Sequence, residues 1–304
     1  MTVIEKKILS NDKKHYLCGK IFVPDGEIKA AFQVVHGMTE HIDRYEPLMT
    51  LLAENGFLTF GHNHLGHKGT ADDSELGFIA AKGGDELLVK DVISFSDAVC
   101  VEYGINKRFL FGHSMGSFVV RLAAEKMKDK LSALVVCGTG GPVPAAPAGL
   151  ALCAFIKRAK GEKYISKTAY KIAFSEYSKG FGESDENCWL SADIKNREVY
   201  KKDKYCTFKF TVSALYDLVK LSYRANSNSW FENISKSLPI YLISGSEDPV
   251  GDYGKGVKAV YEKLKQKGAN VAMKLYDGMR HEILNDIKKE ETKKDILNFF
   301  NDNI

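Results

Sequence analysis

The chain has 304 residues, 44% of them hydrophobic, and its 43 basic and 39 acidic side chains leave a net charge of +4. This length suits one large α/β domain or two small ones, with enough apolar residues for a sizeable core. The nearly balanced charge, without a basic block interleaved with aromatic residues, argues against a nucleic acid partner.

Three features of the sequence bear on the cellular compartment. Residues 1–14 are polar and charged, unlike a signal peptide. The longest apolar run, residues 142–156, contains three prolines and is shorter than the roughly 20 residues that span a bilayer. The six cysteines are scattered without a C-x-x-C pair, which suits a reducing cytosol better than disulfides or a zinc site. We therefore expect a cytoplasmic protein, and no feature indicates its oligomeric state.

The predicted elements begin with an antiparallel hairpin, residues 5–10 and 16–23. Apolar strand segments then alternate with amphipathic helices. We expect strands at 31–35, 57–60, 108–111, 133–137, 240–244 and 271–276, and helices at 44–54, 85–103, 117–128, 253–266 and 290–300. Continuous apolar strands of this kind are typical of a mostly parallel sheet with helices on both faces, so the predicted fold class is α/β.

One stretch, residues 141–230, interrupts this alternation and is here called the inserted segment. It is helix-like and rich in aromatic residues, and its 15 basic and 9 acidic side chains give it a net charge of +6. We expect it to form a helical cap (lid) over the carboxyl edge of the sheet, where open α/β sheets bind ligands. Residues 1–140 and 231–304 would then form the core domain.

The most informative motif is Gly112-His113-Ser114-Met115-Gly116, which lies between a predicted strand and a predicted helix. In this context Gly-x-Ser-x-Gly is the nucleophile elbow of α/β-hydrolases. The strained turn holds the serine hydroxyl clear of the backbone, and only small residues avoid clashes at the two glycine positions. The pentapeptide alone is weak support, since roughly 0.1 chance matches are expected in a chain of this length.

A catalytic serine needs a base, and the base needs an orienting acid. In this fold the chain order is Ser, then Asp or Glu, then His. Asp248 follows the predicted strand 240–244, and His281 follows the predicted strand 271–276. Both therefore lie at the sheet edge that also carries Ser114. We predict a triad of Ser114, Asp248 and His281, with Glu247 as the alternative acid.

The oxyanion hole of this fold combines the amide after the nucleophile, here Met115, with an amide from the loop after the third strand. That loop is His36-Gly37-Met38-Thr39-Glu40-His41, here called the oxyanion loop. Gly37 allows the loop to approach the serine, and the Met38 N–H is the predicted second donor. Each donor stabilises the transition state by roughly 3–4 kcal/mol. We expect Glu40 and His41 to tie the loop to its neighbours, with direct substrate contact as the alternative.

The chain resembles the monoacylglycerol lipase and lysophospholipase-like group of α/β-hydrolases, especially its bacterial members. The resemblance runs from residue 36 to residue 284, and its matching segments are residues 36–41 with Arg44-Tyr45, 63–67, 112–116, Trp189-Leu190-Ser191, 245–251 and 280–284. It implies a serine hydrolase that acts on small-molecule acyl esters, without a metal or an organic cofactor.

One departure from this group concerns Asn63, which stands where an aspartate usually precedes a His-x-Gly-His element. The usual acid is expected to brace the oxyanion loop, and a neutral Asn cannot supply a charge-assisted hydrogen bond. The neighbouring His62, His64 and His67 have a spacing with some precedent among metal ligands. Because they follow a strand in a loop typical of the group, we expect structural roles for them.

The apolar residues 143–156 of the inserted segment have two interpretations. They form either a mobile lid that lines an acyl pocket and contacts a membrane or lipid aggregate transiently, or a helix that is simply buried. An acyltransferase or thioesterase of the same fold is an alternative activity. An aminopeptidase is another, although it must recognise a substrate ammonium, which the basic inserted segment disfavours. The apparently complete triad argues against a non-catalytic ligand receptor.

Overall fold

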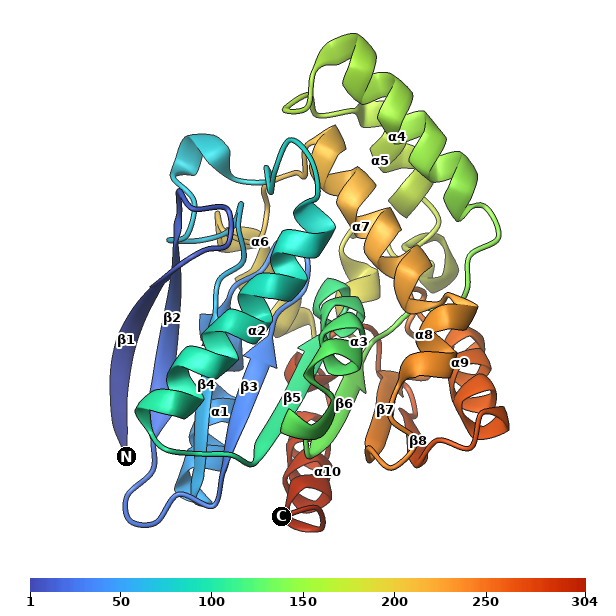
Figure 1. Ribbon diagram of the computed structural model, residues 1–304. Helices are drawn as coiled ribbons and strands as arrows, with labels where there is room; N and C mark the ends of the chain where they lie inside the picture. The colour runs from blue at the N-terminus through green and yellow to red at the C-terminus, as the bar shows by residue number, and fades with distance from the viewer.

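A computed structural model describes residues 1–304 and contains an eight-stranded central sheet with helices on both faces (Figure 1). The strands cross the sheet in the order β1-β2-β4-β3-β5-β6-β7-β8. The pairs β1–β2 and β2–β4 are antiparallel, and all other pairs are parallel. The strand bounds are β1 Thr2–Leu9, β2 Tyr16–Val23, β3 Ala30–Val35, β4 Phe57–His62, β5 Arg108–His113, β6 Ala133–Cys137, β7 Ile240–Gly245 and β8 Val271–Tyr276. The expected α/β-hydrolase fold class is confirmed.

Each face of the sheet has its own core, because successive side chains of a strand point to opposite faces. In β5, Leu110 belongs to one core, whereas Phe109 and Phe111 belong to the other. The helices that contribute to the first core include α2 (Gly84–Glu102), α3 (Met115–Met127) and α9 (Lys255–Gln266). The second face is covered by α1 (Glu46–Glu54) and α10 (Lys289–Asn301), which lie behind the sheet in Figure 1.

The predicted elements differ from the observed ones mainly at their ends. The helix after the elbow begins at Met115 rather than at residue 117, so its first turn starts directly after Ser114. Residues 42–45, of which the last two were predicted to begin a helix, form a separate 3-10 helix, Ile42–Tyr45, before α1. Because β3, β5, β7 and β8 are parallel, the segments that follow them gather at one edge of the sheet, the upper edge in Figure 1.

The chain between β6 and β7 forms five α-helices, two short 3-10 helices and no strand, and it lies above and beside this upper edge (Figure 1). Helix α4 packs along α7, and α7 in turn contacts α2 and α3 of the sheet layer. The five helices are α4 Ala146–Lys160, α5 Lys167–Phe174, α6 Ile194–Lys202, α7 Val212–Ala225 and α8 Asn228–Asn233. The division into a core domain and a cap stays a prediction.

The two ends of the inserted segment are joined to each other by one side chain. The Asn226 amide donates to the backbone carbonyls of Gly140, at 3.3 Å, and Gly141, at 3.2 Å. The buried Arg121 of α3 donates to the Asn226 side-chain oxygen at 3.1 Å and also to the Ala225 carbonyl. We call this arrangement the neck, and it fixes the entry and exit of the segment against the helix that follows the elbow.

Helix α4 leaves much of its apolar surface uncovered. Only Ala146 and Cys153 of this helix are buried, whereas Phe155 is 70% exposed. Ile172 on the neighbouring helix α5 is 65% exposed. The interpretation of residues 143–156 as a simply buried helix is therefore wrong. None of the helices combines the length and the apolar character that crossing a bilayer requires, and all six cysteines are free thiols.

Candidate active site

The elbow turn has the strained geometry that its sequence predicts. Ser114 has φ 53° and ψ −119°, a conformation that L residues rarely adopt. A Cβ on Gly112 would lie 2.3 Å from the Gly116 carbonyl oxygen, and a Cβ on Gly116 would lie 2.2 Å from the Val35 carbonyl oxygen. Both glycines are therefore required by close backbone packing, and Ser114 is the residue held at the tip between β5 and α3.

The predicted acid and base form a buried hydrogen-bonded pair. His281 Nδ1 lies 3.0 Å from each carboxylate oxygen of Asp248. The carboxylate also accepts the Ser244 hydroxyl and the Val250 N–H, both at 2.9 Å, so its orientation is fixed from β7. Glu247, the alternative acid, is half-exposed and lies 3.7 Å from Arg280 rather than at the imidazole. The geometry therefore favours Asp248 over Glu247 as the predicted acid.

The pair shifts the pKa values of both partners toward their charged forms. Burial raises the pKa of Asp248, but the facing imidazole and the hydrogen bonds outweigh it and leave the pKa below 3.8. Burial lowers the pKa of His281, but the Asp248 charge and hydrogen bond outweigh it and leave the pKa above 6.5. An imidazole with its Nδ1 engaged in this way presents its Nε2 as the basic atom.

Ser114 is brought to this pair by its neighbour in the chain. The ring of His113 packs against the ring of His281, with centroids 4.6 Å apart. A Cβ on Gly138 would meet both rings, so Gly138 leaves the space in which they touch. No hydrogen bond joins Ser114 Oγ to His281 in the structure, a bond that often tightens only when substrate is bound. Burial lowers the pKa of His113 to about 3, so this imidazole is neutral and does not compete as a base.

The oxyanion loop lies against the elbow. A Cβ on Gly37 would be 3.0 Å from Ser114 Cβ, which measures how closely the two segments approach. The Gly37 N–H donates to Glu40 Oε1 at 2.5 Å, whereas the Met38 N–H has no partner in the protein. Met115 is the first residue of α3, where helix N–H groups have no intrahelical acceptor. The two amides predicted as donors are therefore both unpaired.

Three neutral histidines hold the oxyanion loop in place. His36 donates from Nδ1 to the Gly37 carbonyl at 2.8 Å and accepts the His64 N–H on Nε2 at 3.0 Å. His67 accepts the Thr39 N–H on Nε2 at 3.3 Å. His64 donates from Nε2 to the His36 carbonyl at 3.1 Å. Burial lowers the pKa of His36 well below its usual range, that of His64 to about 3 and that of His67 to about 4, so the acceptor nitrogens of His36 and His67 stay unprotonated.

These contacts also settle two questions about the neighbouring loop. His64 Nε2 and both ring nitrogens of His67 bond backbone groups, and His62 stacks on Phe95 with centroids 4.7 Å apart, so these contacts are structural ones. Asn63 accepts the Ile42 N–H at 2.8 Å, which braces the end of the oxyanion loop. The neutral side chain thus keeps the bracing role through a hydrogen bond to a backbone amide.

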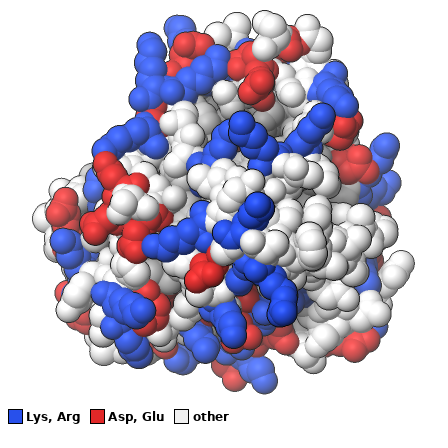
Figure 2. All heavy atoms as spheres, turned by 90° about the horizontal axis from the view of Figure 1, so that it is seen from above, with Lys and Arg blue, Asp and Glu red and all other residues white.

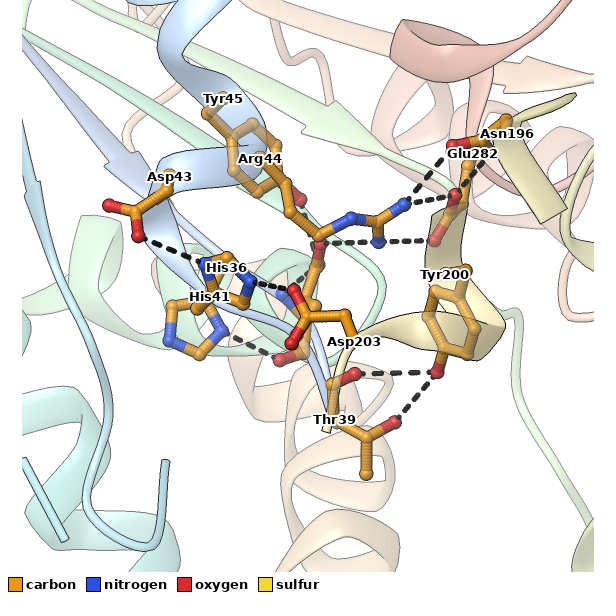
Figure 3. A network of polar contacts seen from close by, with 12 residues as sticks. His36, Thr39, His41, Asp43, Arg44, Tyr45, Asn196, Tyr200, Asp203 and Glu282 are labelled. Carbon is orange, nitrogen blue, oxygen red and sulfur yellow. Dashed lines mark hydrogen bonds and ion pairs between the residues drawn. The ribbon is translucent and has the colours of Figure 1, made fainter. Parts of the chain in front are cut away.

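A buried charged network links this loop to the loop of the base (Figure 3). Arg44 binds both carboxylate oxygens of Glu282, at 2.6 and 2.7 Å, and also lies 3.3 Å from Glu40. Asn196 of α6 donates to Glu282 at 2.7 Å, and Tyr200 of α6 bonds the Thr39 hydroxyl at 3.1 Å. Glu40 contacts Gly37 and Arg44, and Arg44 in turn binds Glu282, the residue next to His281, so the network joins the oxyanion loop to the loop that carries His281.

Several of these residues were not assigned roles from the sequence. Ser244, Asn196 and Tyr200 carry no motif signal of their own, and their contacts depend on how distant elements pack. His113 lies inside the elbow motif, but its contact with His281 depends on packing as well. Trp189 belongs to a segment shared with the resembling group, and its carbonyl accepts the His281 N–H at 3.3 Å. Arg44, His113 and Glu282 also lie in shared segments, so membership in these segments was the available signal for them and for Trp189.

The sheet order and the elbow define an α/β-hydrolase. A family model described as serine aminopeptidase, S33, matches residues 26–288, and the chain belongs to this family. Among curated relatives, human (Homo sapiens) monoglyceride lipase is 26% identical over 276 residues, 90% of this chain and 82% of the lipase.

Two solved structures extend the comparison. A thermostable carboxyl esterase from Bacillus coagulans, in complex with glycerol, is 31% identical with a TM-score of 0.94, covering 100% of this chain and 99% of the esterase. A soluble variant of monoglyceride lipase from Saccharomyces cerevisiae, in complex with a substrate analog, has a TM-score of 0.78 at 18% identity. The match covers 100% of this chain and 97% of the yeast lipase, so the two proteins share the fold. The resemblance to the monoacylglycerol lipase group is thus confirmed.

Proposed function

We propose that this protein is a serine hydrolase that cleaves acyl esters of the monoacylglycerol or lysophospholipid type through Ser114, His281 and Asp248. The observation that carries the proposal is the geometry at one sheet edge. A strained serine turn, a buried His–Asp pair and two unpaired amides lie together there. These are the parts that acyl transfer through a serine requires.

The proposed reaction proceeds through an acyl-enzyme. His281 Nε2 accepts the Ser114 proton as the serine oxygen attacks the ester carbonyl, while Asp248 stabilises the imidazolium. The Met38 and Met115 amides donate to the oxyanion. The alcohol leaves with the proton from His281, and a water molecule activated by the same histidine then releases the fatty acid and restores Ser114.

The coarser part of the assignment rests on the relatives. The chain is a carboxylic ester hydrolase, as are human monoglyceride lipase and the Bacillus carboxyl esterase, each of which it matches over most of that protein's length. The monoglyceride lipase names, together with the glycerol in the Bacillus esterase, support a glycerol ester as the substrate. The long acyl chain and the glycerol-type alcohol of the substrate are part of the proposal.

The family description makes an aminopeptidase the alternative to weigh. Such an enzyme needs a carboxylate free to bind the substrate ammonium. Near the site, Glu282 and Glu40 are occupied by Arg44, and Glu183 of the inserted segment is occupied by Arg197 and Arg280. This pairing favours the ester substrate. An acyltransferase would form the same acyl-enzyme but pass the acyl group to an acceptor other than water. A thioesterase would form it from a thioester instead of an ester.

The surface of the inserted segment supports transient contact with a lipid aggregate. Seen from above, basic side chains are interleaved with acidic ones and with uncharged areas (Figure 2). Phe155 and Ile172 are among its exposed apolar side chains. Apolar side chains beside basic residues are the composition that interfacial binding requires.

The deciding experiment compares several substrates, and for each of them the wild type with the variant that lacks the Ser114 hydroxyl. Hydrolysis of p-nitrophenyl esters with acyl chains of increasing length, a monoacylglycerol, a lysophospholipid and an aminoacyl p-nitroanilide would be measured with the wild type and Ser114→Ala. We expect longer acyl esters to be preferred, the anilide to be inert, and Ser114→Ala to lose both activity and labelling by a fluorophosphonate. Full activity of Ser114→Ala would overturn the triad, and a sharp acetyl ester preference would overturn the lipid substrate alone.

A further inference from the structure

Three side chains with metal-binding donor atoms meet where the oxyanion loop touches the turn after α6. They are His41, Asp203 and Cys206, and one donor atom of each lies within 4.8 Å of the donor atoms of the other two. We propose that this cluster binds a single Zn²⁺ ion, or a divalent ion of similar chemistry, at a site separate from the ester-cleaving residues.

The donor set matches the preference of zinc. Imidazole nitrogen, thiolate sulfur and carboxylate oxygen are its usual ligands, at about 2.0–2.3 Å in a tetrahedral arrangement. Such a site separates its ligand atoms by roughly 3–4 Å. Small shifts of the three donor atoms, including a slight separation of His41 Nε2 from Asp203 Oδ2, would reach this arrangement. A water molecule would complete the fourth position, and Asp203, whose side chain is 30% exposed, leaves the cluster open on that side.

His41 is already oriented as metal-bound histidines usually are. Its Nε2 lies 2.8 Å from Asp203 Oδ2, and its Nδ1 lies 3.4 Å from Asp43 Oδ2, so the ring stands between two carboxylates (Figure 3). A carboxylate behind the distal nitrogen fixes the ring and makes the coordinating nitrogen more basic. Asp43 is itself held by Lys20 at 2.8 Å and Lys68 at 2.6 Å.

An ion pair between His41 and Asp203 would not explain why the Cys206 thiol lies beside them. Cys206 is 2% exposed, and its side chain is a free thiol that forms no hydrogen bond. A tight turn places it beside Asp203, since its N–H donates to the Asp203 carbonyl at 2.9 Å. The Tyr205 N–H donates to Asp203 Oδ1 at 2.8 Å, which leaves Oδ2 directed at His41. The Asp-x-x-Cys turn therefore presents two ligands together, much as short Cys-x-x-Cys turns do.

The local charge also suits a divalent ion. Once the thiol proton has passed to solvent, the carboxylate and thiolate carry two negative charges against the two positive charges of the ion. The nearby cations are already engaged, Arg44 with Glu282 and Lys68 with Asp43. His41 is 162 residues from Asp203 in the chain, so spacing in the sequence could not reveal the site. A bound ion would connect the oxyanion loop to the inserted segment.

The test uses the full chain after removal of adventitious metal with a chelator. Titration with Co²⁺ is expected to saturate at one ion per chain and to produce a sulfur-to-cobalt charge-transfer band, and Zn²⁺ should displace the cobalt and raise the Tm. Cys206→Ser should abolish the band. Cys206→Ser and Asp203→Asn should each weaken Zn²⁺ binding at least about tenfold. Cys18→Ser, at a half-exposed thiol outside the cluster, should behave as the wild type.

Wild-type protein without saturable binding, or without the charge-transfer band, would overturn the proposal. Zn²⁺ affinity that is unchanged in both Cys206→Ser and Asp203→Asn would do so as well, since the ion would then bind elsewhere. If Cys206→Ser does not fold, Asp203→Asn alone decides the outcome. These readouts are independent of esterase activity, so they stand apart from the proposed function.

Discussion

Arg44 donates two parallel hydrogen bonds to Glu282, from Nη1 to Oε1 at 2.6 Å and from Nη2 to Oε2 at 2.7 Å. Glu282 is the residue directly after His281, and Arg44 lies in the short helix Ile42–Tyr45 that follows the oxyanion loop. The ion pair therefore sets the distance between the loop that carries the Met38 amide and the predicted base. Both side chains are buried, so neither charge has water as a substitute partner.

Arg44→Met should destabilise the protein strongly. It leaves Glu282 and Glu40 buried without a cation, and breaking a buried pair in this way costs about 3–5 kcal/mol. Urea unfolding would measure the loss, with Lys6→Met as control, because the exposed Lys6–Glu102 pair contributes less than about 1 kcal/mol. The double variant Arg44→Met/Glu282→Gln should be less destabilised than the sum of its single variants. Strict additivity would contradict a coupled pair.

The pH dependence of activity should follow His281. Its pKa lies above 6.5, since the Asp248 charge outweighs burial, and protonated imidazole cannot accept the serine proton. We therefore expect kcat/KM to fall as the pH drops, with a midpoint above 6.5. Asp248→Asn removes the charge that raises this pKa, so the acid limb should move to lower pH, and kcat should fall by about 10⁴.

Glu247→Gln is the matched control for this experiment, because it changes the neighbouring carboxylate that does not reach the imidazole. Its pH profile for a soluble ester should coincide with that of the wild type. An acid limb that stays in place in Asp248→Asn, or moves in Glu247→Gln, would argue for the alternative acid.

Gly37→Ala should damage catalysis more than folding. The added methyl would lie 2.7 Å from Glu40 Oε1 and 3.0 Å from Ser114 Cβ, so the oxyanion loop must retreat from the elbow. Displacing the Met38 amide removes one oxyanion donor, and kcat should fall by about 10²–10³ with little change in Tm. Gly149→Ala on α4 is the control, since its methyl meets only Val219, at 3.8 Å. Equal kcat values for Gly37→Ala and wild type would exclude Met38 as a donor.

Asp217→Asn should stabilise the protein at high pH. Asp217 on α7 is 2% exposed, and its Oδ2 has no hydrogen-bond partner. Burial, followed by the nearby charge of Asp85, raises its pKa from 3.8 to about 7. The folded state therefore holds this proton more tightly than the unfolded state, and the free energy of unfolding falls as the pH rises from about 4 to about 7.

The asparagine carries no ionisable proton, so it removes the cost of ionising this buried carboxyl group at high pH. That cost is no more than about 4 kcal/mol. Urea unfolding at pH 5 and pH 8 would compare Asp217→Asn with the wild type, using Asp302→Asn near the exposed carboxyl terminus as control. The gain should be clearly larger at pH 8 than at pH 5. A gain that does not depend on pH would mean that the carboxyl group titrates normally.

The sheet and the places of Asp248 and His281 at its edge could be predicted because local signals determine them. Apolar runs mark the strands, and Asp248 and His281 directly follow two of these strands. The Arg44–Glu282 pair joins residues 238 positions apart, and no local pattern records which acid a distant arginine will meet. The exposure of the apolar side chains on α4 could not be predicted either. The composition of this helix suits a buried helix, and only its packing against α7 shows which face is free.

The neck has a practical consequence for protein engineering. Because Asn226 bonds the carbonyls of Gly140 and Gly141, the inserted segment leaves and rejoins the fold at nearly the same place. Residues 141 and 226 therefore mark graft points at which the intervening helices could be exchanged for those of a relative. Ser114, Asp248 and His281 all lie outside this interval. A chimaera built there would exchange the covering helices while keeping the reacting groups of the parent, provided that Asn226 and Arg121 are retained.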